Sequence, residues 1–246
     1  MQKNILLFHK ITEIEQDWED LSIAKFSTFL TLANSQGITF SSLRNNLSNN
    51  ILTFDDGYAS DYELVFPLLK KYQFTATFFI CPGKVGCENY MNWDQIKELN
   101  DSGMEIGSHS MSHPFISTLG KDEIFQEIKN SKEFIESKTH EEVISFAFPY
   151  GDYSNLSLKL AKTVGYSYIC SSKPGLSNLG DNLLRRNNVN SSFSLNSIDP
   201  LIAEKLRFRY RFDSVKYEAI FFLKKLIGVQ NYLKLKKIIK PMTNAK

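Results

Sequence analysis

The sequence is poor in the residues that cross-link a chain or bury it in a bilayer. It contains only three cysteines, Cys81, Cys87 and Cys170, and an odd, sparse set forms no paired disulfide framework. We therefore expect reduced thiols in a reducing compartment. No apolar run approaches the roughly 20 residues that a membrane-spanning helix requires. The sequence thus excludes a disulfide-rich secreted scaffold and an integral membrane protein.

The N-terminal segment lacks the features of a secretion signal. Its apolar stretch covers only residues 5–8, and no small-residue cleavage site follows. We therefore expect a cytoplasmic location. With 42% hydrophobic and 23% charged residues, the 246-residue chain has the composition of an ordinary globular domain.

The small net charge of +2 conceals a strong asymmetry along the chain. Residues 204–246 contain 12 Lys or Arg and 3 Asp or Glu, a charge of +9, whereas residues 1–203 contain 17 and 24, a charge of −7. The pattern predicts a basic amphipathic helical tail over residues 201–246, in peripheral contact with the anionic inner face of the membrane. The alternative is a terminal helix that packs on the domain and exposes a basic face. Nucleic-acid binding is not expected, because no binding motif accompanies the charge.

Short apolar runs alternate with segments of helical periodicity. Strands are expected near residues 5–9, 51–54, 74–80, 104–106, 143–148, 166–170 and 183–189. Helices are expected over residues 18–33, 62–72, 94–100, 121–137 and 156–164. Pro67 should kink or restart the second helix, and Gly165 should cap the last. Strands that alternate with helices predict parallel βαβ units in one α/β domain.

Two adjacent carboxylates, Asp55 and Asp56, follow an apolar strand and precede Gly57. Neighbouring side chains of an extended strand point to opposite faces, so both can serve one site only where the strand ends and the backbone turns. Gly57 permits such a turn. Parallel α/β folds keep their active sites at the C-terminal ends of strands. Alone, however, an Asp-Asp-Gly sequence is more often an ordinary turn.

His109 and His113 are two of only four histidines in the chain. On a helical turn, their i, i+4 spacing would put both imidazoles on one side. Two neutral imidazoles and one carboxylate leave an open position for water on a metal ion, which is the arrangement of a catalytic zinc site. The alternative is a pair of surface histidines.

Both motifs, each just after an apolar strand, resemble those of the polysaccharide deacetylase family, also called the NodB-homology family of carbohydrate esterases. Residues 66–72 (FPLLKKY), 76–79 (ATFF) and 105–109 (EIGSH) are also similar to that family. The resemblance covers roughly residues 5–190. It implies a distorted (β/α) barrel of about seven parallel strands over residues 1–200. It also implies removal of acetyl groups from N-acetylated sugars.

The resemblance further implies a metal centre. Asp56, His109 and His113 match the metal ligands of the family, and Asp55 matches its catalytic base. A bound metal ion polarises a carbonyl and lowers the pKa of water. A nearby unligated carboxylate can then act as a general base. We expect zinc, and the same donor set suits cobalt, nickel or iron.

Residues 148–151 (FPYG) match the third motif of the family. The resemblance places Pro149 and Tyr150 at the substrate, where the Tyr150 N–H would stabilise an oxyanion. The motif usually begins with an arginine that orients the base, and here Ala147 stands in its place. Arg186 is our candidate to replace that arginine on the substrate side of the site, and a surface arginine is the alternative.

A late family motif, Leu-x-His, normally supplies the general acid that protonates the leaving amine. No histidine follows His140, but residues 7–9 (LFH) have the same form at the end of the first strand. The first and last strands of a closed barrel are neighbours, so the N-terminal strand could present the same group. We therefore predict that His9 is the general acid. The alternative is a strand-end histidine with a structural hydrogen bond.

These features together predict a metal-dependent hydrolase that removes the N-acetyl group of an amino sugar in a glycan or a glycan precursor. A nucleotide- or lipid-linked sugar of surface-glycan assembly fits the expected location. One alternative is a catalytically silent carbohydrate-binding module of the same fold. The missing arginine favours that alternative, whereas the retained ligands and base oppose it. Another alternative is a metal-dependent hydrolase of a different amide or ester.

Overall fold

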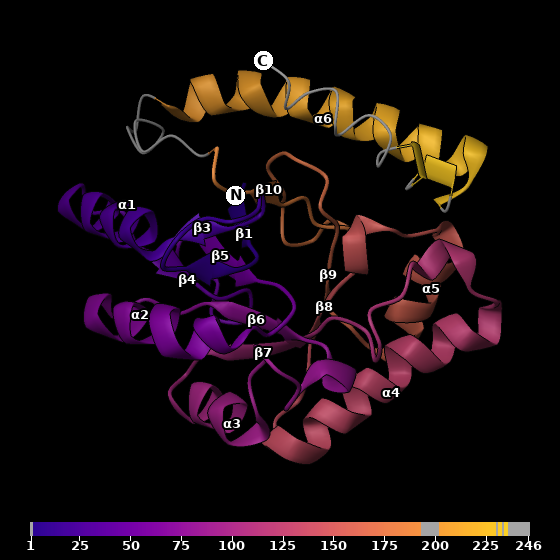
Figure 1. Cartoon of the computed structure of the whole chain (residues 1–246), viewed down its shortest axis with the longest axis horizontal. Helices are drawn as coiled ribbons and strands as arrows, with labels where there is room; N and C mark the ends of the chain where they lie inside the picture. Colours follow the sequence, from indigo (N-terminus) through magenta and orange to yellow (C-terminus); the bar gives the residue numbers. More distant parts are fainter. Residues whose placement is uncertain (1, 193–201, 230, 233, 236–246) are drawn as a thin grey trace.

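The fold is a curled parallel sheet surrounded by helices (Figure 1). The computed structural model describes residues 2–192, 202–229, 231–232 and 234–235. Its strands pair in the order β10-β1-β5-β6-β7-β8-β9, and each of these pairings is parallel. The strands are β1 (Asn4–Phe8), β5 (Asn50–Phe54), β6 (Thr77–Ile80), β7 (Glu105–Ser108), β8 (Ser145–Ala147), β9 (Tyr168–Cys170) and β10 (Asn187–Asn188). This architecture confirms the predicted distorted (β/α) barrel.

The segment that leads into β10 joins the two ends of the sheet. Leu184 forms a parallel bridge with Cys170 of β9, and its N–H donates to the Ile169 carbonyl at 2.7 Å. Farther along, Asn187 of β10 pairs with Leu6 of β1. The first strand therefore neighbours the last, and Figure 1 shows the N-terminus beside β10.

Short strands flank the first helix near the N-terminus. β2 (Ile11–Thr12) pairs with β3 (Leu21–Ser22), and β4 (Phe40–Ser41) pairs with the start of β5. The Ser22 side chain then accepts a hydrogen bond from the Lys25 N–H at 3.4 Å, which caps α1 (Ile23–Ser35). The predicted start of this helix at Trp18 was wrong, because strand pairing and the cap move it to Ile23.

Helices α1 to α5 lie around the outside of the sheet (Figure 1). After α1 come α2 (Phe66–Tyr72), α3 (Trp93–Asp101), α4 (Lys121–Thr139) and α5 (Asn155–Val164). A π-helical turn, η1 (Asp61–Val65), precedes α2, and Pro67 lies in the first turn of α2. A missing N–H costs no hydrogen bond there, so Pro67 restarts the helix as predicted. Gly165 has φ +99° and ends α5, also as predicted.

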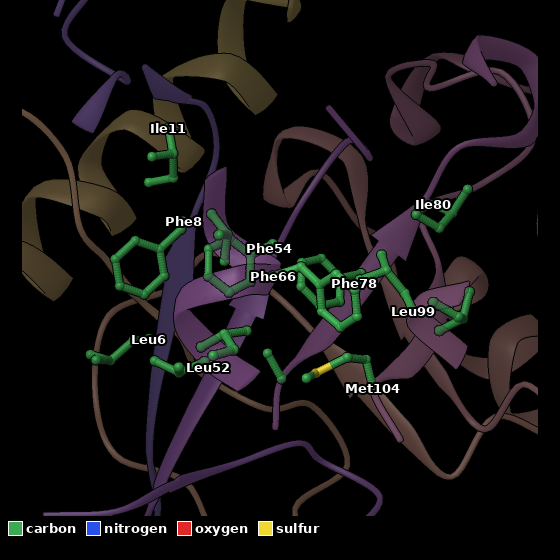
Figure 2. Close-up of a cluster of buried hydrophobic side chains, with 14 of the residues drawn as sticks. Leu6, Phe8, Ile11, Leu52, Phe54, Phe66, Phe78, Ile80, Leu99 and Met104 are labelled. Carbon is green, nitrogen blue, oxygen red and sulfur yellow. The ribbon is translucent and has the colours of Figure 1, made fainter. Parts of the chain in front are cut away.

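A row of stacked phenyl rings crosses three neighbouring strands. Phe8, Phe54 and Phe78 are aligned in register on β1, β5 and β6. Their ring centroids lie 5.1 Å apart for Phe8 and Phe54 and 5.0 Å apart for Phe54 and Phe78. Figure 2 shows this cluster, which belongs to the large core between the sheet and the outer helices. The stacked rings pack β1, β5 and β6 together next to the edge where β1 and β5 end and the predicted site begins.

The inner face of the barrel carries a separate, smaller apolar cluster. Its buried members are Ile5, Leu43, Ile51, Phe79, Ala147, Cys170 and Leu184. Because side chains alternate along a strand, every second residue after Ile5 and Ile51 points to this inner face. His9 lies four residues after Ile5, and Asp55 lies four residues after Ile51. They therefore follow the inner cluster at the open edge of the barrel.

Helix α6 (Ile202–Ile227) lies across the barrel at the top of Figure 1. The Tyr217 hydroxyl donates to the Gly151 carbonyl at 2.9 Å, and the Phe221 ring lies 5.4 Å from the ring of Tyr153. This part of the predicted tail therefore packs on the barrel. None of the described helices has the length and apolar character of a membrane-spanning segment. Within the predicted tail, residues 201, 230, 233 and 236–246 lie outside the described residues.

Candidate active site

The predicted site residues follow the C-terminal ends of neighbouring strands. His9 follows β1, Asp55 follows β5 and His109 follows β7. The Asp55 N–H donates to the Phe8 carbonyl at 3.0 Å, and the His109 N–H donates to the Ile80 carbonyl at 2.8 Å. These bonds continue the sheet by one residue. Because parallel strands end at the same edge, the side chains gather at one mouth of the barrel.

Asp55 is held by a buried, bidentate ion pair. Arg186 donates to its two carboxylate oxygens at 2.6 and 2.7 Å and, from Nε, to the Ser171 carbonyl at 2.9 Å. The guanidinium is 0% exposed and lies 5.2 Å from the centre of the Phe79 ring. Burial alone would raise the pKa of Asp55, but the charge and hydrogen bonds of Arg186 outweigh it and lower the pKa. Asp55 is therefore a rigid carboxylate. The position of Arg186 fits orientation of this base, and its burial leaves no surface for a substrate.

A sharp backbone turn brings Asp56 to the same mouth. Asp56 and Gly57 have φ values of +77° and +74°. These values lie in the left-handed region, which residues other than glycine seldom adopt. A Cβ on Gly57 would also lie 3.0 Å from Cδ1 of Ile80. The turn therefore favours glycine at position 57, and it rotates the second carboxylate out of the strand alternation.

The Asp56 carboxylate has two cationic or hydrogen-bonding partners on one oxygen. Its Oδ1 lies 3.0 Å from Nε2 of His113 and 2.9 Å from Nζ of Lys84. Burial would raise the pKa of Asp56, but the hydrogen bond to His113 and the charges of His109, His113 and Lys84 hold it well below its usual range. Asp56 is therefore ionised, as a metal ligand must be.

His109 is a buried, oriented imidazole. Its Nδ1 lies 2.8 Å from the Ala147 carbonyl. A carbonyl oxygen can only accept, so Nδ1 carries the proton and Nε2 keeps its lone pair. Nε2 points toward the carboxylates and lies 3.8 Å from Oδ2 of Asp55. Burial lowers the pKa of His109 to about 4, so the ring is neutral near pH 7.

His113 lies in a loop, so its predicted placement on a helical turn was wrong. Ser110 and His113 both have φ +63°, which no α-helix accommodates. Glu127 of α4 accepts from the Met111 N–H at 2.9 Å, and the Ser110 hydroxyl oxygen accepts from the His113 N–H at 3.1 Å. These bonds to side chains fold the loop back on itself. The two imidazoles still converge, with ring centroids 4.8 Å apart.

Asp56, His109 and His113 together could hold a metal ion. Their nearest potential ligand atoms all lie within 4.8 Å of one another. The bond from His109 Nδ1 to the Ala147 carbonyl is the kind of outer contact that fixes metal-binding histidines. Two imidazole nitrogens and one carboxylate oxygen suit zinc and other first-row divalent ions. The side chains in this structure therefore fit the predicted metal.

The third-motif residues form one side of the mouth. Pro149 is buried, and Tyr150 is half-exposed with φ +57°. The Tyr150 ring stacks on Phe115 at 4.0 Å and lies edge-on to the His113 ring at 4.6 Å. Tyr150 therefore stands directly beside a predicted metal ligand.

His9 stands beside Asp55 at the same mouth of the barrel. β1 and β5 pair in register through Phe8 and Phe54, so the next residues, His9 and Asp55, are neighbours. The charge of His9 contributes to the low pKa of Asp55. Nδ1 of His9 is buried and has no hydrogen-bond partner among the described residues. An unpaired buried nitrogen at the site is a candidate for contact with a substrate or water.

Lys84 is a site residue that the sequence reasoning missed. It ends the short helix η2 (Pro82–Lys84), which follows β6, and its ammonium contacts Asp56. Burial works to lower the pKa of Lys84, but the Asp56 carboxylate outweighs it and raises the pKa. The available signal was its position just after a predicted strand, at the same edge as Asp55 and His109.

Comparison with known proteins identifies the family. A family model described as polysaccharide deacetylase matches residues 48–169. The matched segment contains the residues of the site that follow β5, β7 and β8. The chain belongs to the polysaccharide deacetylase family. This membership confirms the resemblance inferred from the sequence motifs.

Curated relatives of this deacetylase-family chain act on N-acetylated glycans, according to their names. Over 126 residues it is 32% identical to a peptidoglycan-N-acetylglucosamine deacetylase of Bacillus cereus, which covers 51% of this chain and 57% of that protein. Over 131 residues it is 30% identical to a poly-beta-1,6-N-acetyl-D-glucosamine N-deacetylase of Staphylococcus aureus, which covers 48% of this chain and 45% of that protein. The match spans about half the length of these curated relatives.

Solved structures agree on the fold. A deacetylase of Streptococcus pyogenes in complex with acetate superposes with a TM-score of 0.75 and 23% identity, covering 84% of this chain and 98% of that chain. A de-N-acetylase from Aggregatibacter actinomycetemcomitans superposes with a TM-score of 0.73 and 18% identity, covering 84% of this chain and all of that chain (100%). At these identities the likeness supports the barrel alone.

Proposed function

We propose that this protein is a metal-dependent N-deacetylase of an amino sugar in a glycan or a glycan precursor. One observation carries the proposal: the Arg186-bound Asp55 carboxylate lies beside the group of Asp56, His109 and His113. A pure sugar-binding module has no use for a base and a metal-ligand set at one mouth. Family membership and the names of the relatives support the same activity.

The geometry supports the proposed role of each site residue. Asp56, His109 and His113 hold the ion, with zinc preferred and cobalt, nickel or iron as alternatives. When bound, the ion acts as a Lewis acid and lowers the pKa of water. Asp55 accepts the proton of the attacking water, because Arg186 keeps this carboxylate ionised and oriented.

Two further groups complete the proposed reaction. The Tyr150 N–H donates to the acetamide oxygen as that oxygen gains negative charge. His9, beside Asp55, donates a proton to the leaving nitrogen as the carbon–nitrogen bond breaks. The products are acetate and a free amine. Pro149 and the Tyr150 ring contact the acetyl group beside His113.

Acetate release from a panel of N-acetylated substrates tests the proposal. The panel contains peptidoglycan fragments, β-1,6-linked N-acetylglucosamine oligomers, and nucleotide- and lipid-linked N-acetylated sugars. We expect release that a chelator abolishes and zinc restores. Sugar binding without acetate release would instead identify a catalytically silent carbohydrate-binding module. Release only from non-sugar amides or aryl esters would identify a hydrolase of another substrate class.

We also propose that the protein works at the inner face of the membrane, on a precursor made in the cytoplasm. The described part of the tail supports this idea. Val215, Phe222 and Leu226 are spaced along one face of α6 and are 70%, 66% and 70% exposed. The tail sequence around this face is strongly basic, as binding to anionic lipids requires. Co-sedimentation with anionic but not neutral vesicles is expected, and its absence would contradict the location.

A further inference from the structure

The Lys84 ammonium lies against the carboxylate oxygen that the proposed metal would need. Nζ is 2.9 Å from Oδ1 of Asp56, and the same oxygen is 3.0 Å from Nε2 of His113. The Tyr90 ring lies 5.2 Å from Nζ, which adds a cation–π contact. The side chain of Lys84 is only 25% exposed, so water screens the pair incompletely.

The backbone around Lys84 is packed directly on the histidine loop. The Gly83 N–H donates to the Met111 carbonyl at 2.9 Å. A Cβ on Gly83 would lie 2.8 Å from that carbonyl oxygen, closer than real Cβ atoms come. A residue other than glycine would therefore push the two loops apart. The close packing places Lys84 beside the loop that carries His113.

The fixed charges of the site balance without a metal ion. Asp55 and Asp56 are anionic, and Arg186 and Lys84 are cationic. A divalent ion held by Asp56 would add two positive charges a few ångströms from the Lys84 ammonium. Repulsion between cations at such distances is strong in a partly buried site. The ion and the ammonium therefore compete for Asp56, and the weakening of each by the other is reciprocal.

We propose that Lys84 is a built-in counter-ion of Asp56 that the metal ion displaces. Lys84 stabilises the metal-free site and lowers its affinity for the ion. The inference rests on the proposed metal site but not on turnover. Arg186 does not play this part, because it is fully buried against Asp55 and touches no predicted ligand.

Zinc affinity of three variants tests the inference. The full-length wild type and the variants Lys84→Met, Lys84→Arg and Lys129→Met are each titrated with zinc at pH 7 in the presence of a competing chelator. Methionine keeps an unbranched side chain without the charge, and arginine keeps the charge. Lys129 of α4 is a control, since it forms an exposed pair with Glu133. We expect Lys84→Met to bind zinc about tenfold more tightly and the other two variants to stay within about twofold of wild type.

Thermal unfolding gives a second readout that needs no substrate. In excess chelator, Lys84→Met should melt below wild type, because Asp56 has lost its counter-ion. In excess zinc the two melting temperatures should converge. Unchanged or weaker zinc binding by Lys84→Met that is folded by circular dichroism overturns the counter-ion inference alone. Absence of zinc binding in every variant and in wild type overturns the proposed metal-dependent function as well.

Discussion

Asp55 and Asp56 are adjacent in the sequence, yet their surroundings differ in kind. Both oxygens of Asp55 are bound by a guanidinium that is itself completely buried. Asp56 instead meets an imidazole and a partly exposed ammonium through one oxygen. Separating Asp55 from Arg186 would leave two buried charges without partners. A metal ion could instead replace the partners of Asp56. This difference in partners, rather than the shared sequence motif, supports the proposed roles of Asp55 as base and Asp56 as metal ligand.

The largest expected effect comes from substituting the two aspartates separately. Asp55→Asn should lower acetate release by about 10³-fold or more, because the general base is lost. It should keep the metal, because no ligand has changed. Asp56→Asn should lose both the metal and the activity. Acetate assays paired with elemental analysis of the purified variants measure both quantities. Loss of metal from Asp55→Asn with retention in Asp56→Asn would reverse the assignment.

Removing Arg186 should convert Asp55 into an unpaired buried carboxylate. Arg186→Met is expected to destabilise the protein by about 3–5 kcal/mol in urea unfolding at pH 7. The neighbouring variant Arg185→Met is the matched control and should cost about 1 kcal/mol or less.

Arg186→Met should also change how stability and activity depend on pH. Arg186 holds the folded-state pKa of Asp55 below its usual value of 3.8. The stability it adds is therefore present above that value and is lost as the pH falls through the lower folded-state pKa. Without Arg186 the pKa of Asp55 rises, so the acid limb of the pH–rate profile should move to higher pH. An unmoved acid limb in folded Arg186→Met would contradict the role of Arg186 in keeping Asp55 ionised.

Buried His109 should make the metal-free protein less stable in mild acid. Burial lowers its pKa from 6.5 to about 4, so the unfolded chain takes up the proton first as the pH falls. Stability should therefore decline from about pH 6.5 to about pH 4, by about 3 kcal/mol in all. Urea unfolding in chelator at several pH values measures the decline. The difference between wild type and His109→Gln isolates this residue, and a difference independent of pH would contradict the assignment.

The smallest effect on activity is expected from substituting His9. His9→Gln should slow deacetylation of an N-acetyl sugar by about 10²-fold, because the amine must leave without a proton donor. An aryl acetate, whose leaving group needs no proton, should be much less affected. Metal content and melting temperature should stay near wild type. Equal losses with both substrates would favour a structural role for His9.

Local signals made much of the fold predictable. Pro67 and Gly165 act through their own backbone geometry, so the restart of α2 and the end of α5 could be read from the sequence. The same holds for the turn at Gly57, which lets two adjacent aspartates meet at one mouth. The alternation of strands and helices likewise predicted the parallel βαβ units of the sheet.

Contacts between distant segments were beyond such signals. The conformation of the loop at His113 depends on Glu127 of α4, whose carboxylate replaces the helical hydrogen bonds that the i, i+4 spacing suggested. The pairing of Arg186 with Asp55 joins residues 131 positions apart, so the sequence could offer Arg186 only as a candidate. Lys84 lies beside Asp56 because Gly83 packs tightly on the Met111 carbonyl. No sequence motif predicts this contact.

Anomalous diffraction at the zinc absorption edge, from crystals of the zinc-loaded protein, tests the division between the two aspartates most directly. The account predicts one strong peak bound by Asp56, His109 and His113, with Asp55 still paired with Arg186 and outside bonding distance of the ion. A peak bound by Asp55, or a peak away from both histidines, would contradict it.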